Sequence, residues 1–155
     1  AFSYCKSLTT ITLPDTLNSL GSYAFNHCEK LTTAQLSNAL TAIETATFAN
    51  CTNLLSITIP ADVTTIGESA FFGCENLSTF NCLATTPPTL GNLALDKYSK
   101  TTEDYTTESG DESIKETYTV VAIGANIYVP ATSVDTYKSA AGWSNYASKI
   151  TGKSF

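Results

Sequence analysis

Four cysteines recur at a fixed interval, and this interval is the strongest constraint on what the chain can fold into. Each cysteine follows the previous one by 23 residues, and aligning the chain on them brings phenylalanine, leucine and isoleucine columns into register. A unit of this length cannot bury its own apolar face, so such units must stack and share one continuous core. The cysteine column is Cys5, Cys28, Cys51 and Cys74, and the phenylalanine column is Phe2, Phe25, Phe48 and Phe71.

Within one unit the spacing of the apolar residues changes, and this change separates two elements. Residues 54–60 alternate apolar and polar side chains around Thr58 and end at Pro60, the pattern of a short strand that proline closes. Residues 66–74 space their apolar side chains by four, one and three positions, which predicts one or two helical turns ended by Gly73 at positive φ. Stacking therefore predicts parallel strands on one side of the core and helical turns on the other.

The repeat resembles a known family. The pattern Ile-Gly-x-x-Ala-Phe-x-x-Cys-x-x-Leu-x-x-Ile-x-Ile-Pro is similar to the BspA-like leucine-rich repeat of bacterial surface proteins, and residues 51–67 carry nearly every position of it. The resemblance covers residues 1–92 and returns at 127–131, which we interpret as a final strand closed by proline. It implies a right-handed α/β solenoid of leucine-rich type that is secreted or displayed on the cell surface and acts in adhesion or protein binding.

The sequence predicts a single domain over residues 1–155, with four repeats in 1–92 and a last coil in 93–131. An insertion at 97–119 interrupts that coil, because it carries no Cys-x-x-Leu-x-x-Ile register. Its two halves are rich in Thr and Tyr and flank the turn-prone Ser109-Gly110-Asp111, which predicts a projecting β-hairpin. A disordered loop is the alternative, since the segment is strongly polar.

The end of the chain, residues 132–155, is predicted to be a C-terminal cap. Ser133 can N-cap a short helix over 134–141, and Gly142 can end it. Trp143, Tyr146 and Ile150 then supply the apolar bulk that covers the last coil, as a solenoid needs. The chain contains no Met and no leader, so we expect it to be the C-terminal part of a longer protein.

Charge and motif content exclude several function classes. The chain has 14 acidic and 8 basic residues, and every basic residue is lysine, which argues against nucleic acid as a partner. No apolar run approaches the ~20 residues that span a bilayer, so we predict no membrane insertion. His27 is the only histidine, and the catalytic motifs of hydrolases, metalloproteases and phosphate-binding loops are absent. We therefore predict that the chain is not an enzyme.

We interpret the cysteines as buried thiols that serve as small apolar side chains. No two of them have the close spacing of a structural zinc pair, and side chains stacked in a parallel column point the same way rather than at each other. The acids of the insertion lack the pattern of a calcium loop, so we interpret them as a solvated face. The sequence therefore predicts no metal and no cofactor.

Short uncharged polar residues alternate with the buried columns and are expected to form two ladders on the face of the sheet. They form either a ligand surface or simply a solvent-facing strand surface, which threonine suits. Tyrosines of the insertion could add exposed anchors. The candidate binding residues are Thr10, Thr12, Thr33, Gln35, Ser56, Thr58, Thr79, Asn81, Tyr98, Tyr105 and Tyr118.

The predicted function is a non-catalytic extracellular or cell-surface module for adhesion or protein binding, whose partner is a protein of the host's extracellular space or a glycan. One alternative is a carbohydrate-binding module whose platform consists of Tyr and Trp residues of the C-terminal region. Tyr98, Tyr105 and Tyr118 of the hairpin are the candidates for exposure, although the two ladders contain no aromatic residue. The other alternative is a structural spacer that holds a neighbouring domain away from the cell.

Overall fold

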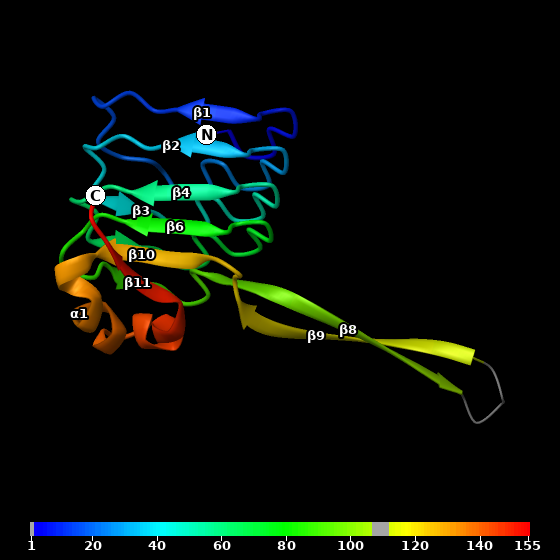
Figure 1. Cartoon of the computed structure of the whole chain (residues 1–155). Coiled ribbons are helices and arrows are strands. Elements are labelled where there is room, and N and C mark those ends of the chain that lie inside the picture. The colour runs from blue at the N-terminus through cyan, green and yellow to red at the C-terminus, as the bar shows by residue number, and fades with distance from the viewer. Residues whose placement is uncertain (1, 107–111) are drawn as a thin grey trace.

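The repeats form a solenoid of stacked coils whose main sheet lies on one side (Figure 1). The computed structural model describes residues 2–106 and 112–155, without the side chains of residues 104–106, 112 and 113, so the predicted Ser109-Gly110-Asp111 turn lies outside it. The main sheet is parallel, in the order β1-β2-β4-β6-β10-β11. Its strands are β1 (Thr10–Thr12), β2 (Thr33–Gln35), β4 (Ser56–Ile59), β6 (Thr79–Cys82), β10 (Asn126–Pro130) and β11 (Ile150–Lys153).

The return segments are stacked turns, not the helical turns that the apolar spacing predicted. Eight residues of these segments have positive φ, two in each of three coils, and such residues cannot continue a right-handed helix. Their amides donate to the next coil instead, as in the hydrogen bond from the Tyr23 N–H to the Thr45 carbonyl. Short strands form a second parallel sheet on this side: β3 (Ala42–Ile43), β5 (Thr65–Ile66) and β7 (Thr89–Leu90). The positive-φ residues are Tyr4, Tyr23, His27, Ala46, Asn50, Ser69, Gly73 and Leu93.

The core contains a stack of phenylalanine rings, one from each of the first four coils. The rings of Phe25 and Phe48 are nearly parallel with centroids 5.3 Å apart, and those of Phe48 and Phe71 are 5.5 Å apart. The Phe48 N–H donates to the Ala70 carbonyl at 2.8 Å, and the same bond recurs from the Phe25 N–H to the Thr47 carbonyl. Ring stacking and backbone hydrogen bonds thus repeat with the 23-residue period.

The Ile-Gly step of the repeat marks a close approach between coils. A Cβ atom on Gly67 would lie 2.6 Å from the Thr45 backbone nitrogen, and one on Gly91 would lie 2.4 Å from the Glu68 nitrogen. Leu90 pairs with Ile66 in the second sheet, so Leu90-Gly91 takes the place of the Ile-Gly step with a shift of one residue.

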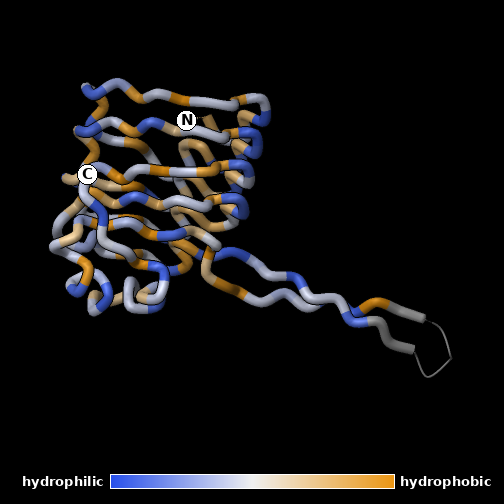
Figure 2. The backbone as a smooth tube through the Cα atoms, viewed as in Figure 1, coloured by the Kyte–Doolittle hydropathy of each residue, from blue (hydrophilic) through white to orange (hydrophobic). Residues whose placement is uncertain are grey.

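The insertion is a long β-hairpin, as predicted. Strands β8 (Asp96–Thr106) and β9 (Glu112–Ala122) pair antiparallel and project away from the solenoid (Figure 1). Its root is anchored where the Tyr98 ring meets the Phe72 ring edge-on at 5.0 Å. Figure 2 shows a hydrophobic stretch where β9 joins the solenoid.

The C-terminal residues cover the last coil, but the details of the predicted cap were partly wrong. The helix α1 (Val134–Ser139) ends two residues early, and Ser133 makes no side-chain capping bond. Gly142 adopts a φ of 80° before the 3₁₀ helix η2 (Trp143–Lys149) instead of ending α1, while Ala131–Ser133 form the 3₁₀ turn η1. The final strand is β11, because residues 150–153 pair in parallel with β10.

Three buried aromatic side chains fix this cap to the preceding coil. The Trp143 indole N–H donates to the Pro88 carbonyl at 2.7 Å, and the Tyr137 hydroxyl donates to the Ala84 carbonyl at 2.8 Å. The Tyr146 hydroxyl donates to the Asp96 carboxylate at 2.9 Å. Each polar atom is therefore satisfied although its ring is buried.

The phenylalanine stack provides a matched test of this core. Phe48→Ala is expected to cost about 3–5 kcal/mol, because a ring stacked on both sides and fully buried leaves a cavity. Phe2→Ala is the control and should cost only about 1–2 kcal/mol, because that ring is 50% exposed and stacks on one side. Urea unfolding measures both. An equal loss of unfolding free energy in the two variants would contradict the stacking of Phe48 between two neighbouring rings.

Candidate binding surface

The outward side chains of the main sheet form the largest set of predicted site residues that the structure brings together. They alternate along each strand with the buried core columns, as the exposed and buried positions of β4 show. The strand register then aligns them from coil to coil. We call these eight residues the ladder face: Thr10, Thr12, Thr33, Gln35, Ser56, Thr58, Thr79 and Asn81.

The ladder face is polar, uncharged and mostly open to solvent. Six of its eight side chains are exposed, and those of Thr79 and Asn81 are half-buried. The Asn81 side-chain amide donates to the Thr58 hydroxyl at 3.1 Å. The Asn81 Oδ1 is buried and has no hydrogen-bond partner among the described residues.

A shallow groove of about 330 Å³ runs into this face between β2 and β4. In the part of the chain that the structure describes, these two strands pair at one position only, where Thr33 lies opposite Ser56. Ala34 lies on the groove wall, at a position that isoleucine or phenylalanine fills in the other coils, and its small side chain leaves space there. The other lining residues are Thr33, Gln35, Leu36, Asn38, Ser56, Ile57, Thr58, Pro60 and Leu83.

An aromatic residue extends the ladder face, and the sequence interpretation missed it. Tyr128 of β10 pairs with Asn81 and therefore continues the ladder that Thr12, Gln35, Thr58 and Asn81 form. The Lys153 ammonium lies 5.4 Å from the centre of the Tyr128 ring and 5.5 Å from that of Phe155. Aligning residues 127–129 with 57–59 would have revealed this position, because both segments alternate in the same way.

Two of the three hairpin tyrosines share one face of the ribbon. Tyr98 lies opposite Val120 and Tyr118 lies opposite Lys100, so both belong to the same set of alternating positions. Their side chains are 59% and 56% exposed. Tyr105 holds a position on the other face, and its side chain lies outside the described residues. Most of the hairpin lies outside the solenoid, so these tyrosines and the ladder face are not one continuous patch (Figure 1).

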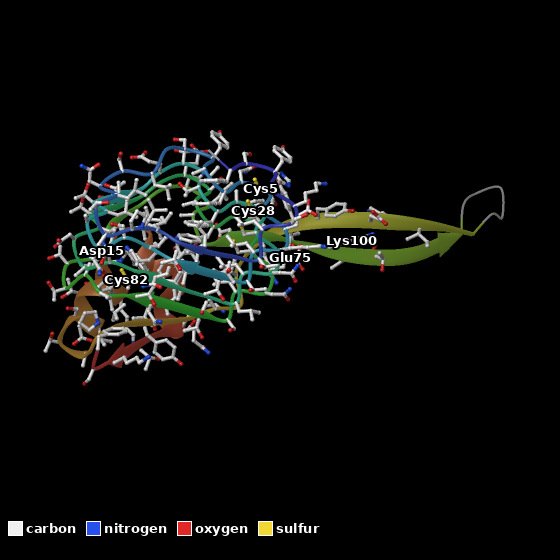
Figure 3. All side chains as sticks on the ribbon, turned by 90° about the horizontal axis from the view of Figure 1, so that it is seen from above. Cys5, Asp15, Cys28, Glu75, Cys82 and Lys100 are labelled. Carbon is white, nitrogen blue, oxygen red and sulfur yellow. The ribbon has the colours of Figure 1, made fainter. Side chains whose placement is uncertain are left out.

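A small polar cluster surrounds Tyr118. Lys100 forms an ion pair with Glu116, and the Tyr118 hydroxyl donates to the Glu116 carboxylate at 2.8 Å. Hydrogen bonds from Lys100 and Tyr118 lower the pKa of the Glu116 carboxyl, and the bond to Glu116 raises the pKa of Tyr118. Figure 3 shows Lys100 on the hairpin, near the end at which the hairpin leaves the solenoid.

His27 is held in a column of turn residues. Its ring stacks on that of Tyr4 at 4.8 Å, and its Nε2 lies 3.2 Å from the Asn50 side-chain nitrogen. Its φ of 56° belongs to one of the positive-φ positions that recur in each coil, so it does not end a helical turn. These contacts give His27 a structural role between coils.

The comparison with protein families decides what kind of repeat this is. The family model described as the BspA type leucine rich repeat region, in six copies, matches residues 1–101. The chain belongs to the BspA-type leucine-rich repeat family. The predicted family and the predicted class, an α/β leucine-rich-repeat solenoid with a parallel sheet, are therefore confirmed. The family points to a repeat-based protein-interaction module.

The chain also resembles solved structures, among them a leucine-rich repeat protein. This BspA-type chain is similar to the crystal structure of a leucine-rich repeat protein from Bacteroides ovatus ATCC 8483, with 23% sequence identity and a TM-score of 0.41. The match covers 61% of this chain and 42% of that chain, so this chain spans less than half of that protein's length. No curated protein matches.

The cysteine column of this BspA-type repeat serves packing. The thiols of Cys28, Cys51 and Cys74 donate at 3.1–3.2 Å to phenylalanine carbonyls of the preceding coil. All five cysteines are free, and Figure 3 shows Cys82 apart from Cys5 and Cys28. Across residues 2–106 and 112–155, no group of three or more His, Cys, Asp or Glu residues could hold a metal ion. In the same part of the chain, no helix is long and apolar enough to cross a bilayer.

Thiol reactivity tests this assignment. Burial raises the pKa of Cys51 to about 12 and raises those of Cys28, Cys74 and Cys82, so little thiolate forms in the native state near pH 8. Cys5 is half-buried and should react first. Titration of the native protein should therefore find at most one reactive thiol, which Cys5→Ser removes, and denaturation should expose the rest. Several reactive native thiols, or an intact mass showing a disulfide, would refute the assignment.

Proposed function

We propose that this chain is a non-catalytic protein-binding module that acts in adhesion outside the cell, and that it contacts its partner through the ladder face and the hairpin. The observation that carries the proposal is the uncharged polar surface that runs across four adjacent coils and contains a groove. The core requires only the inward side chains, so these outward positions are free to serve binding.

The size of the ladder face explains why the hairpin belongs to the proposal. Four strands about 4.8 Å apart span about 15 Å, which is small beside the ~800 Å² that each partner contributes to a stable interface. The hairpin adds exposed Tyr98 and Tyr118 on one ribbon face, and tyrosines are frequent anchors of interfaces. A partner that contacts both the ladder face and the hairpin would bury an area closer to that of a stable interface.

One feature supports an extracellular location, and a second is compatible with it. The repeat resembles that of bacterial surface proteins, and its unpaired cysteines are no obstacle to an oxidising environment. Four of the five thiols are buried, so oxidants do not reach them, and none of the five forms a disulfide in this structure.

Carbohydrate binding is the second candidate, and one observation favours it. Tyr128 brings an aromatic ring to the end of the ladder face, beside Asn81. Lys153 covers part of that ring, however, and the remaining ladder positions are short aliphatic hydroxyls and amides. A stacking platform for sugars needs an open ring face, so protein binding is the better-supported function.

The test compares the same substitution on the two sheets of the solenoid. The chain is screened against arrays of glycans and of purified extracellular proteins, and the screen is repeated with Thr58→Arg on the ladder face. A protein ligand is expected, and Thr58→Arg should weaken its binding about tenfold or more, or about 1.4 kcal/mol. Thr65→Arg is the control, because Thr65 is an exposed strand residue of the second sheet.

The outcomes separate the three functions. Binding to glycans alone would replace the proposal with the carbohydrate-binding module, and silence in both arrays would favour the spacer. Equal loss of protein binding in the two arginine variants would remove the ladder face from the site.

A further inference from the structure

The hairpin exposes the edge of a strand that is well suited to pair with another strand. Within the part of the chain that the structure describes, β9 pairs only with β8, so its outer backbone edge faces solvent. Two-stranded ribbons are marginal in water, and three or more strands with an apolar face are usually needed for stability. An eleven-residue exposed edge is therefore a template for strand addition.

Sequence and burial single out β9 rather than β8 as the pairing edge. Five charged residues are spread along β8, whereas the last six residues of β9, Thr117–Ala122, carry no charge, proline or glycine. Such segments have a high tendency to form strand pairs. Four apolar or aromatic side chains of β9 are exposed, namely Ile114 (65%), Tyr118 (56%), Val120 (48%) and Val121 (36%).

We propose that β9 pairs antiparallel with β9 of a second copy of this chain, so that two hairpins form one four-stranded sheet. The two-fold axis lies at Thr117, and Thr117 of one copy faces Thr117 of the other. This inference goes beyond the proposed function, because it concerns the backbone edge of β9 and a different partner, a second copy of this chain.

The register follows from the residues. Directly opposite residues of an antiparallel sheet share a face, so the two-fold axis must lie at a residue and not between two. The axis at Thr117 overlaps all of β9 and places Ile114 opposite Val120 of the other copy. An axis at Glu116 would place two carboxylates opposite each other, which is unfavourable. An axis at Tyr118 would place Glu116 opposite Val120.

The same register also fits the polar residues. Glu116 faces Tyr118 of the other copy, and these two side chains already form a hydrogen bond within one chain. Lys115 faces Thr119, so no like charges lie directly opposite. Antiparallel pairing sends the two solenoids to opposite ends of the sheet, because each hairpin projects away from its own solenoid (Figure 1).

The contact area predicts a dimer that depends on concentration. An eleven-residue strand is about 37 Å long, and a contact strip about 10 Å wide gives each copy about 370 Å². This is less than half of the ~800 Å² that each partner contributes to a standard stable interface. We therefore expect monomers at about 1 µM and dimers near about 1 mM, the range of weak specific association.

The test is sedimentation equilibrium of the full chain with charge variants at the two-fold position. Thr117→Lys and Thr117→Glu should each abolish the dimer, because each places two like charges opposite each other. An equimolar mixture of the two variants should restore a dimer. Thr101→Lys is the matched control, because Thr101 lies opposite Thr117 on the same ribbon face but on the far strand, and it should leave dimerisation unchanged.

A second variant keeps the proposal falsifiable. Replacing residues 97–119 with a short Gly/Ser linker should give a monomer at every concentration, with thermal unfolding confirming that the solenoid is intact. The proposal is overturned by a monomeric wild-type chain at about 1 mM. It is equally overturned if the dimer persists in Thr117→Lys or in the linker variant. It is also overturned if Thr101→Lys weakens the dimer as much as Thr117→Lys does, or if the mixture of Thr117→Lys and Thr117→Glu does not form a dimer.

Discussion

Each coil of this solenoid depends on the coil beside it. The backbone N–H groups of the return turns donate to the next coil, and the phenylalanine rings stack along the same direction. An isolated coil would leave these donors unpaired and its rings exposed. Phe25 and Phe48, which have a ring stacked on both sides, are fully buried. Stability is therefore a property of neighbouring pairs, as expected for a repeat protein.

This dependence divides the side chains into two classes with different freedom. Inward positions are fixed by the contact with the preceding coil: Gly67 has no room for a Cβ atom, and the Cys51 thiol donates to the Phe25 carbonyl. Outward positions contact solvent, so they can vary without loss of the fold. The ladder face and the hairpin both lie in this second class, which is why they are the surfaces proposed for binding.

The architecture could be predicted from the sequence because the period was visible in side chains that pack. The cysteine and phenylalanine columns gave the register, and the absence of that register in 97–119 gave the hairpin. The prediction of helical return segments was wrong because the spacing of apolar residues indicates which side chains are buried. It does not indicate which conformation the backbone adopts. Positive φ at Ala46 or Ser69 leaves no mark in a hydrophobic pattern, since neither residue is glycine.

The candidate site was predictable only in part for a related reason. Strand alternation placed Thr58 and Asn81 outward correctly, whereas Tyr128 was missed because the insertion separates it from the repeats by sequence. The strand β11 was missed because Ile150 was assigned to bulk packing alone, although it also pairs with Ile127. The segments that form β10 and β11 share no repeated motif. Their pairing depends on how the cap packs, and the spacing of residues in the sequence does not reveal this packing.

The central claim is that coupling runs only between adjacent coils, and double-mutant cycles test it most directly. Phe25→Leu, Phe48→Leu and Phe71→Leu are combined in pairs, and the free energy of unfolding is measured in urea. Adjacent pairs, Phe25 with Phe48 and Phe48 with Phe71, should deviate from additivity by about 0.5 kcal/mol or more, while Phe25 with Phe71 should add within about 0.3–0.5 kcal/mol. Coupling of equal size in all three pairs, or in none, would contradict a solenoid stabilised by nearest-neighbour stacking.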